Sequence, residues 1–124
     1  MRLSGDFFFP ESVQENRFVV RLNAAHYIYA AHFPGHPVTP GVCLVQMVQE
    51  LLSQSFGCPL FTRTIRNVKF LNIVSPLDNE RVAVCITRMA DDGSQVSVQA
   101  VITADADDSR VFAKMSLVME RNPF

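Results

Sequence analysis

Tryptophan is absent from this chain of 124 residues, which contains only three cysteines, five glycines and two tyrosines. The cysteines are Cys43, Cys58 and Cys85, an odd number, and no two have the spacing of a redox pair or a zinc site. We therefore expect a reduced, cytoplasmic protein that folds without a metal or disulfides. Ten phenylalanines and a hydrophobic content of 48% suffice for the core of one domain spanning residues 1–124.

Long runs of one charge and long apolar runs are absent as well. The net charge is −1 and the pI about 6.3, so there is no basic field of the kind that binds nucleic acid. No apolar run approaches the roughly 18 residues that span a membrane. The first residues also lack the basic and then apolar pattern of a secretory leader. We expect a soluble protein that binds neither nucleic acid nor a membrane.

Hydrophobic periodicity predicts one long helix and several strands. Residues 41–56 are expected to be helical, because Gly57 suits the residue after the last turn and Pro59 prevents continuation. Polar residues form one narrow stripe on this helix, which indicates a sheet wrapped around it. The stripe comprises Gln46, Gln49, Glu50 and Ser53. The expected strands are residues 7–9, 17–22, 62–73, 81–89, 95–103 and 110–119, an α+β pattern with an antiparallel meander at its end.

The segment before this helix is rich in proline. Pro34, Pro37 and Pro40 each fix φ and withhold a donor, so residues 32–40 should form a stiff loop that holds His32 near the helix. The first helical turn leaves backbone N–H groups unpaired, and Gly41 has no side chain to hinder an approaching carbonyl oxygen. A base and an oxyanion site are thus predicted side by side.

Residues 31–50 read AHFPGHPVTPGVCLVQMVQE. This segment resembles the active-site segment of the hot-dog-fold β-hydroxyacyl-(acyl carrier protein) dehydratases, whose pattern is roughly GHFPxxPxxPGVLxxEAxAQ. Residues 22–26, 68–70 and 75–78 also look like elements of that family. The resemblance implies a hot-dog fold, in which a long helix lies inside an antiparallel sheet. It also implies a homodimer, which in some members associates further, with each site taking its histidine from one chain and its acid from the other.

The resemblance implies removal of water from a 3-hydroxyacyl thioester to give a trans-2-enoyl thioester, in fatty-acid, polyene or polyketide-type biosynthesis. His32 is then the base for the C2 proton, since an unperturbed histidine has a pKa of about 6.5. The Gly41 N–H stabilises the enolate oxygen. The substrate is carried on the phosphopantetheine arm of an acyl carrier protein, so the enzyme itself needs no cofactor or metal.

The acid position departs from the family pattern. Where the family has Glu or Asp this chain has Gln46, and where the family has Gln it has Glu50. A carboxamide cannot release a proton at physiological pH. Either Glu50, one turn further along, gives the proton to the hydroxyl, or His32 returns the C2 proton to it while Gln46 orients it. We favour the second mechanism. Alternatively, Gln46 and Glu50 form a buried polar network with a structural role.

Other residues are candidates for contacts with the acyl chain and the carrier protein. The apolar tunnel for the acyl chain would be lined by Phe33, Val42, Val45, Phe70, Tyr27 and Tyr29. An acidic carrier would contact Arg63, Arg66 and Lys69, which otherwise form a solvated strand face. His26 and His36 are expected to be structural and loop residues. Cys43 is expected to be a small core residue, with a reactive thiol as the alternative because a helix N-terminus lowers a thiol pKa.

Three functions are compatible with these residues. The first is a 3-hydroxyacyl-carrier-protein dehydratase, a hydro-lyase, which the loop containing His32 favours. The second is a hot-dog thioesterase in which Glu50 activates water. The third is a catalytically silent acyl-binding protein or heterodimer partner, which Gln46 keeps open. Release of free acid would identify a thioesterase, and carrier binding without turnover would identify a silent partner.

Overall fold

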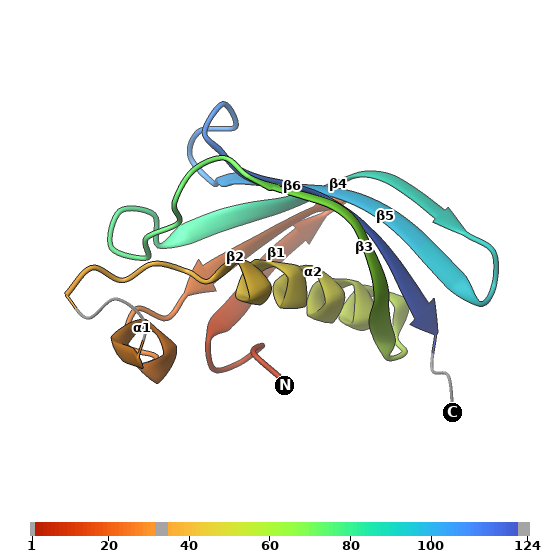
Figure 1. The fold of residues 1–124 in the computed structure, drawn as a ribbon, viewed down its shortest axis with the longest axis horizontal. Helices are drawn as coiled ribbons and strands as arrows, with labels where there is room; N and C mark the ends of the chain where they lie inside the picture. Colours follow the sequence, from red (N-terminus) through yellow and green to blue (C-terminus); the bar gives the residue numbers. More distant parts are fainter. Residues whose placement is uncertain (1, 32–34, 122–124) are drawn as a thin grey trace.

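The computed structural model describes residues 2–31 and 35–121, which form one curved sheet and two helices (Figure 1). The strands are β1 (Phe8–Gln14), β2 (Arg17–Leu22), β3 (Leu60–Phe70), β4 (Arg81–Asp91), β5 (Gln95–Ala104) and β6 (Val111–Arg121); the helices are α1 (Tyr27–Ala31) and α2 (Gly41–Phe56). All strand pairs are antiparallel, in the order β1-β2-β4-β5-β6-β3. The predicted architecture, a long helix against an antiparallel sheet, is confirmed.

The long helix and the second strand have the predicted bounds. Pro40 precedes α2 in an extended conformation, with φ −61° and ψ 142°, and its carbonyl accepts the first helical hydrogen bonds. Gly57 ends the helix at φ 69°, a left-handed conformation that glycine adopts without steric cost. These local signals explain why the helix could be placed from the sequence. The four strands expected after the helix also form, with ends shifted by up to three residues, but only β4, β5 and β6 follow one another as a meander, because β3 pairs with β6 and not with β4.

Two elements differ from the prediction. The first strand, expected at residues 7–9 before Pro10, instead runs through this proline as β1. Because β1 is an edge strand and its pairing register shifts between Pro10 and Ser12, the missing proline N–H costs little there. Helix α1 was not predicted at all. Its five residues are too few to show a helical period.

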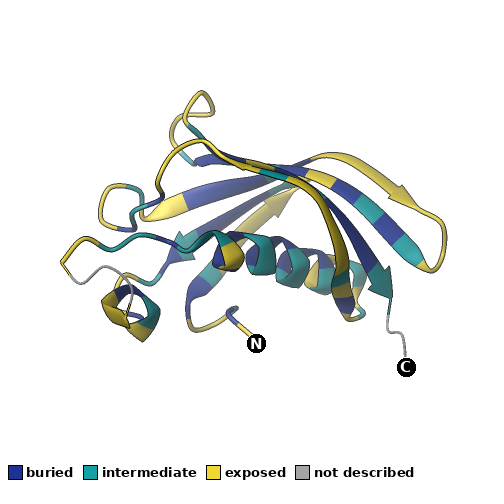
Figure 2. Cartoon of the chain, viewed as in Figure 1, coloured by how far each residue is buried: buried dark blue, intermediate teal, exposed yellow. Residues whose placement is uncertain are grey.

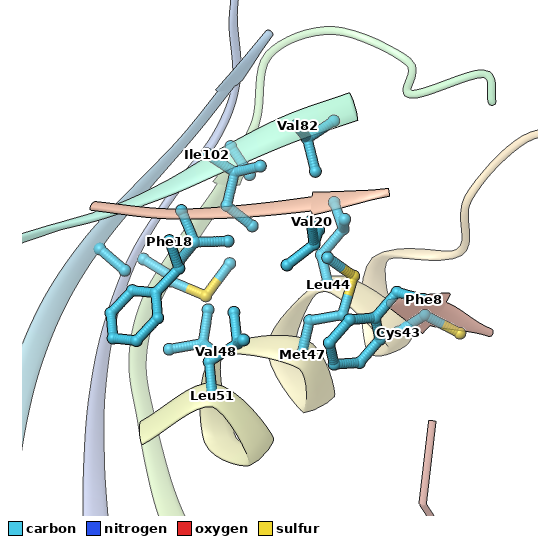
Figure 3. Packing of buried hydrophobic residues seen from close by; sticks show 14 of the residues in the cluster. Phe8, Phe18, Val20, Cys43, Leu44, Met47, Val48, Leu51, Val82 and Ile102 are labelled. Atoms are coloured by element: carbon cyan, nitrogen blue, oxygen red, sulfur yellow. The ribbon is translucent and has the colours of Figure 1, made fainter. Parts of the chain in front are cut away.

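The curved sheet wraps around one side of α2 (Figure 1). The buried residues of α2 face the sheet, as the dark blue stretches of Figure 2 show. These residues are Cys43, Leu44, Met47, Val48, Leu51 and Leu52, and Figure 3 shows several of them against strand residues such as Val20 and Ile102. A fully buried side chain of this size contributes about 1.5–3 kcal/mol. Among the described residues, no helix is long and apolar enough to cross a membrane.

Candidate functional site

The first turn of α2 offers unpaired backbone donors. The Pro40 carbonyl accepts from the N–H groups of Cys43 at 3.0 Å and Leu44 at 3.3 Å. The N–H groups of Gly41 and Val42 donate to no acceptor within residues 2–31 and 35–121. Together with the positive end of the helix dipole, these donors can stabilise an oxygen that gains negative charge. His32, Phe33 and Pro34, which the sequence places before this turn, lie outside the described residues.

Phe70 occupies the space that the missing side chain of Gly41 leaves. A Cβ atom on Gly41 would lie 2.5 Å from Cζ of Phe70, so only glycine allows this ring to rest on the helix. The glycine was expected to admit a carbonyl oxygen, whereas in the structure it admits an aromatic ring. The two residues line an apolar cavity of about 190 Å³ with Val38, Leu44, Ile73 and Val74. This volume is below the roughly 300 Å³ at which ligand pockets begin.

The other residues proposed for the tunnel do not converge on this cavity. Val42 is 67% exposed, and Tyr27 is 73% exposed. Val45 is half-buried and packs against the core. Tyr29 is buried, and its ring stacks on Phe7 at 5.1 Å. In the described part of the chain, only Gly41 and Phe70 of the proposed substrate-contacting set line this cavity.

Tyr29 connects the two ends of the proline-rich loop. Its hydroxyl lies 3.0 Å from Oγ1 of Thr39, and both residues are buried. Thr39 is held in turn by its N–H, which donates to the Val74 carbonyl at 2.8 Å. Burial raises the pKa of Tyr29 to about 12, although the hydrogen bond with Thr39 acts in the opposite direction. The phenol is therefore neutral at physiological pH and joins residues 29 and 39 as a structural link.

His26 has the structural role that was expected. It is buried, and its Nδ1 accepts the N–H of Ile28 at 3.1 Å, in the first turn of α1. Because Nδ1 is an acceptor, the proton is on Nε2, which lies 3.1 Å from the Asp6 carboxylate. His36 is exposed in the loop before α2, as predicted.

The polar stripe of α2 binds backbone groups from two other segments. Oε1 of Gln49 accepts the N–H of Thr62 at 2.8 Å, and Oγ of Ser53 accepts the N–H of Leu60 at 3.0 Å. These two bonds hold the start of β3. On the other side of the stripe, Glu50 accepts from the N-terminal segment. The sequence pattern shows the stripe but not its partners, which are backbone groups of the N-terminal segment and of the strand that follows the helix.

Gln46 and Glu50, the two candidates for the acid position, lie together. Nε2 of Gln46 donates to Oε2 of Glu50 at 2.9 Å, which is the contact that the structural alternative required. Both residues line a pocket of about 570 Å³ between the N-terminal segment, α2 and the start of β3. Other residues that line this pocket include Arg2, Ser53, Cys58, Leu60 and Phe61. Its size is within the range of ligand pockets.

The alternative role of Cys43 as a reactive thiol is wrong. Cys43 is 2% exposed and belongs to the core, and burial raises the pKa of its thiol. A helix N-terminus lowers a thiol pKa, but at Cys43 this effect is outweighed because desolvation disfavours the thiolate. Cys43 is the small core residue that was the first expectation.

The three basic residues of β3 do not form one row. The register of β3 against β6 shifts between Thr62 and Thr64 and between Ile65 and Asn67, which leaves Arg63 and Arg66 at irregular positions. Arg63 forms an ion pair with Glu120. Lys69 lies directly opposite Lys114 of β6, and both are exposed.

A family model described as "ApeI-like: ApeI dehydratase" matches residues 10–110. The chain belongs to the ApeI-like dehydratase family. This membership confirms the resemblance to dehydratases that the proline-rich segment indicated.

A curated relative agrees with this membership. The 3-hydroxyacyl-[acyl-carrier-protein] dehydratase FabZ of Rickettsia canadensis is 31% identical over 90 residues, which cover 63% of this chain and 63% of that relative. The chain therefore spans less than two thirds of the length of this relative.

Solved structures show that this member of the ApeI-like family has the predicted hot-dog fold. One is the dehydratase heterocomplex ApeI:P from Xenorhabdus doucetiae, with a TM-score of 0.64 and 15% identity over 91% of this chain and 95% of that chain. Another is a putative thioesterase, yhdA, from Lactococcus lactis, with a TM-score of 0.59 and 14% identity over 85% of this chain and 80% of that one. A dehydratase and a putative thioesterase both share this fold, so structural similarity alone does not distinguish dehydration from thioester hydrolysis.

The contact between Gly41 and Phe70 yields a stability prediction. With Phe70→Ala in place, Gly41→Ala should stabilise the protein by about 0.5–1 kcal/mol, as glycine-to-alanine changes in helices do. With Phe70 present the gain should vanish or reverse, because the ring has to move. Urea unfolding of the four proteins measures this coupling, and an equal gain in both backgrounds would refute the contact.

Proposed function

We propose that the chain is a 3-hydroxyacyl thioester dehydratase with the fatty-acid, polyene or polyketide type of substrate. The observation that carries this proposal is the first turn of α2, which follows the proline-rich loop and where the N–H groups of Gly41 and Val42 have no acceptor among the described residues. An enolate oxygen formed during loss of water requires such donors. Membership of the ApeI-like dehydratase family supports the same reaction.

In the proposed mechanism His32 acts as the single base. It removes the C2 proton, the electrons pass to the thioester carbonyl, and the oxygen binds the Gly41 N–H. The imidazolium then gives this proton to the hydroxyl group as the C3–O bond breaks, which yields the trans-2-enoyl thioester and water. Gln46 orients the hydroxyl group by a hydrogen bond and transfers no proton.

We propose a homodimer with two such sites. The sheet order ends at β3, whose outer edge has no strand partner among the described residues. Phe61, Ile65 and Phe70 of β3 are each more than 40% exposed, which is typical of a surface that another chain covers. Joining β3 of two copies would extend the sheet and bring the α2 stripe of one copy toward the other. Each site would then combine His32 of one chain with Gln46 of its partner.

The proposed reaction can be tested in reverse, as hydration of an enoyl thioester by the unmodified protein. Incubated with a trans-2-butenoyl carrier protein, it should add one water, which intact mass detects, and His32→Ala should abolish the gain because the base is lost. Gln46→Glu should leave the rate unchanged or lower it, since no acid is needed at this position.

Three other outcomes of this assay identify the alternatives. Release of free acid would indicate a thioesterase. Hydration only in Gln46→Glu would indicate a dehydratase site that glutamine has inactivated. Carrier binding without turnover in either protein would indicate a silent acyl-binding protein or heterodimer partner.

The carrier protein is proposed to contact the sheet at Lys69 and Lys114. Like charges directly opposite each other on two strands are destabilising. In the described residues neither lysine forms an ion pair, whereas Arg63 is paired with Glu120. Lys69 precedes Phe70, whose ring rests on Gly41, and as successive residues of a strand the two face opposite sides of the sheet, so the lysines lie on the face away from α2. An acidic carrier surface would relieve the repulsion.

Charge reversal tests this contact. Lys69→Glu/Lys114→Glu should raise KM for a carrier-bound thioester at least about fivefold at low salt, with a smaller effect at high salt. The kcat/KM for a free pantetheine thioester should stay unchanged, because it has no carrier. Arg88→Glu, which makes the same change of charge at an exposed position on β4, is the control. Equal effects on both substrates would contradict carrier docking at this pair.

A further inference from the structure

Tyr29 and Thr39 form a pair of hydroxyl groups that is closed off from solvent. Tyr29 is 3% exposed and Thr39 is 5% exposed, and their side-chain oxygens lie 3.0 Å apart. The Thr39 N–H donates to the Val74 carbonyl at 2.8 Å, which holds the backbone that carries one hydroxyl group. The ring that carries the other stacks on Phe7 at 5.1 Å. Both oxygens are therefore held by contacts that do not involve the hydroxyl groups themselves.

This pair contains one more hydroxyl hydrogen than it can use. Each hydroxyl group carries one hydrogen, but only one hydrogen can lie between the two oxygens. Neither hydroxyl group has a second hydrogen-bond partner among residues 2–31 and 35–121. A buried donor without an acceptor costs free energy. The pair is therefore able to donate one further hydrogen bond.

The chemistry of the two groups decides which hydrogen is available. A phenol is more acidic than an aliphatic alcohol and is the stronger donor, whereas the oxygen of the alcohol is the better acceptor. Burial raises the pKa of Tyr29 to about 12, so the phenol keeps its hydrogen at physiological pH. Tyr29 therefore donates to Oγ1 of Thr39, and the hydrogen of the Thr39 hydroxyl group is the one that remains available.

Thr39 lies beside the first turn of α2. It lines the apolar cavity of about 190 Å³ together with Gly41, and only Pro40 separates the two residues in sequence. The Gly41 N–H has no acceptor in the described part of the chain. Because one water molecule takes about 30 Å³, the cavity has room for a group of about six non-hydrogen atoms. A hydroxyl donor and a backbone donor thus belong to residues that line the same small cavity.

We propose that the Thr39 hydroxyl group is a further catalytic group, which donates to the thioester carbonyl oxygen of the substrate beside the Gly41 N–H, and that Tyr29 is the positioning residue that orients it. This inference rests on the proposed dehydratase function for its substrate. Negative charge develops on the carbonyl oxygen when the C2 proton is removed, and hydrogen bonds to this oxygen then strengthen. The substrate supplies the acceptor for the available hydrogen of Thr39.

Substitutions at position 39 test the donor. Thr39→Val removes the hydroxyl group and keeps the shape of the side chain, so kcat for hydration of a trans-2-butenoyl thioester should fall about 100-fold with a smaller change in KM. Thr39→Ser retains the hydroxyl group and should restore most of the rate. Thr103→Val is the control, because Thr103 is also buried and donates to the Ala104 carbonyl at 3.1 Å. An equal loss in Thr103→Val would contradict the proposal.

Tyr29→Phe separates orientation from stability. It should lower kcat about tenfold in the unmodified protein but have no further effect in Thr39→Val, because Tyr29 acts through the Thr39 hydroxyl group. The double variant replaces both partners of the hydrogen bond by apolar groups of similar shape, so its urea unfolding midpoint should stay close to that of the unmodified protein. Losses in kcat that multiply, or that follow the unfolding midpoints, would overturn the inference.

A carbonyl vibration tests the contact without turnover. The infrared band of S-butanoyl pantetheine, isotopically labelled at its carbonyl carbon, should move to lower wavenumber on binding, because a donated hydrogen bond weakens the C=O bond. The shift should be smaller in Thr39→Val. No shift in the unmodified protein, or the same shift in Thr39→Val, would overturn the inference. If the unmodified protein hydrates nothing, the proposed function fails, while the band still decides whether Thr39 contacts the carbonyl oxygen.

Discussion

The structure depends on the one-sided burial of α2. The sheet covers the apolar side of this helix, so the polar stripe on the helix needs hydrogen-bond partners elsewhere in the chain. It finds them in backbone N–H groups: Gln49 and Ser53 hold the start of β3, and Glu50 holds the N-terminal segment. The stripe therefore positions the N-terminal segment, which is far from the helix in sequence, and the start of β3, which follows the helix directly. The pocket that contains Gln46 lies between those segments.

Separate contacts hold the first turn of α2 in place. Pro40 starts the helix without a capping side chain, and the ring of Phe70 rests on Gly41. Tyr29 and Thr39 join the two ends of the loop that precedes this turn. These contacts hold in place the two backbone N–H groups that have no acceptor in the described part of the chain, and stabilisation of an oxyanion requires donors held in position.

Much of this fold could be predicted because its signals are local. Pro40 and Gly57 determine the bounds of α2, and alternation determines the strands of the meander. Helix α1 was missed since it is too short for a period. The strand β1 was cut short at Pro10 because a proline is unfavourable in most strands, although not at an edge.

The candidate site was predictable in its residues but less so in their contacts. The motif located Gly41, Gln46 and Glu50, whereas the partners of Glu50 and the ring over Gly41 come from residues distant in sequence. Similarly, the alternative of a reactive thiol at Cys43 was based on its position at a helix start, whereas its burial depends on the sheet that covers the helix. The spacing of residues along a chain does not contain such information.

The proposed reaction uses one base and no carboxylic acid. The most direct test is the pH dependence of kcat/KM for dehydration of a 3-hydroxybutyryl thioester between about pH 5 and pH 9. We predict one limb that rises as His32 loses its proton, followed by a plateau. A bell-shaped profile whose falling limb disappears in Glu50→Gln would contradict the account, because Glu50 would then be the acid.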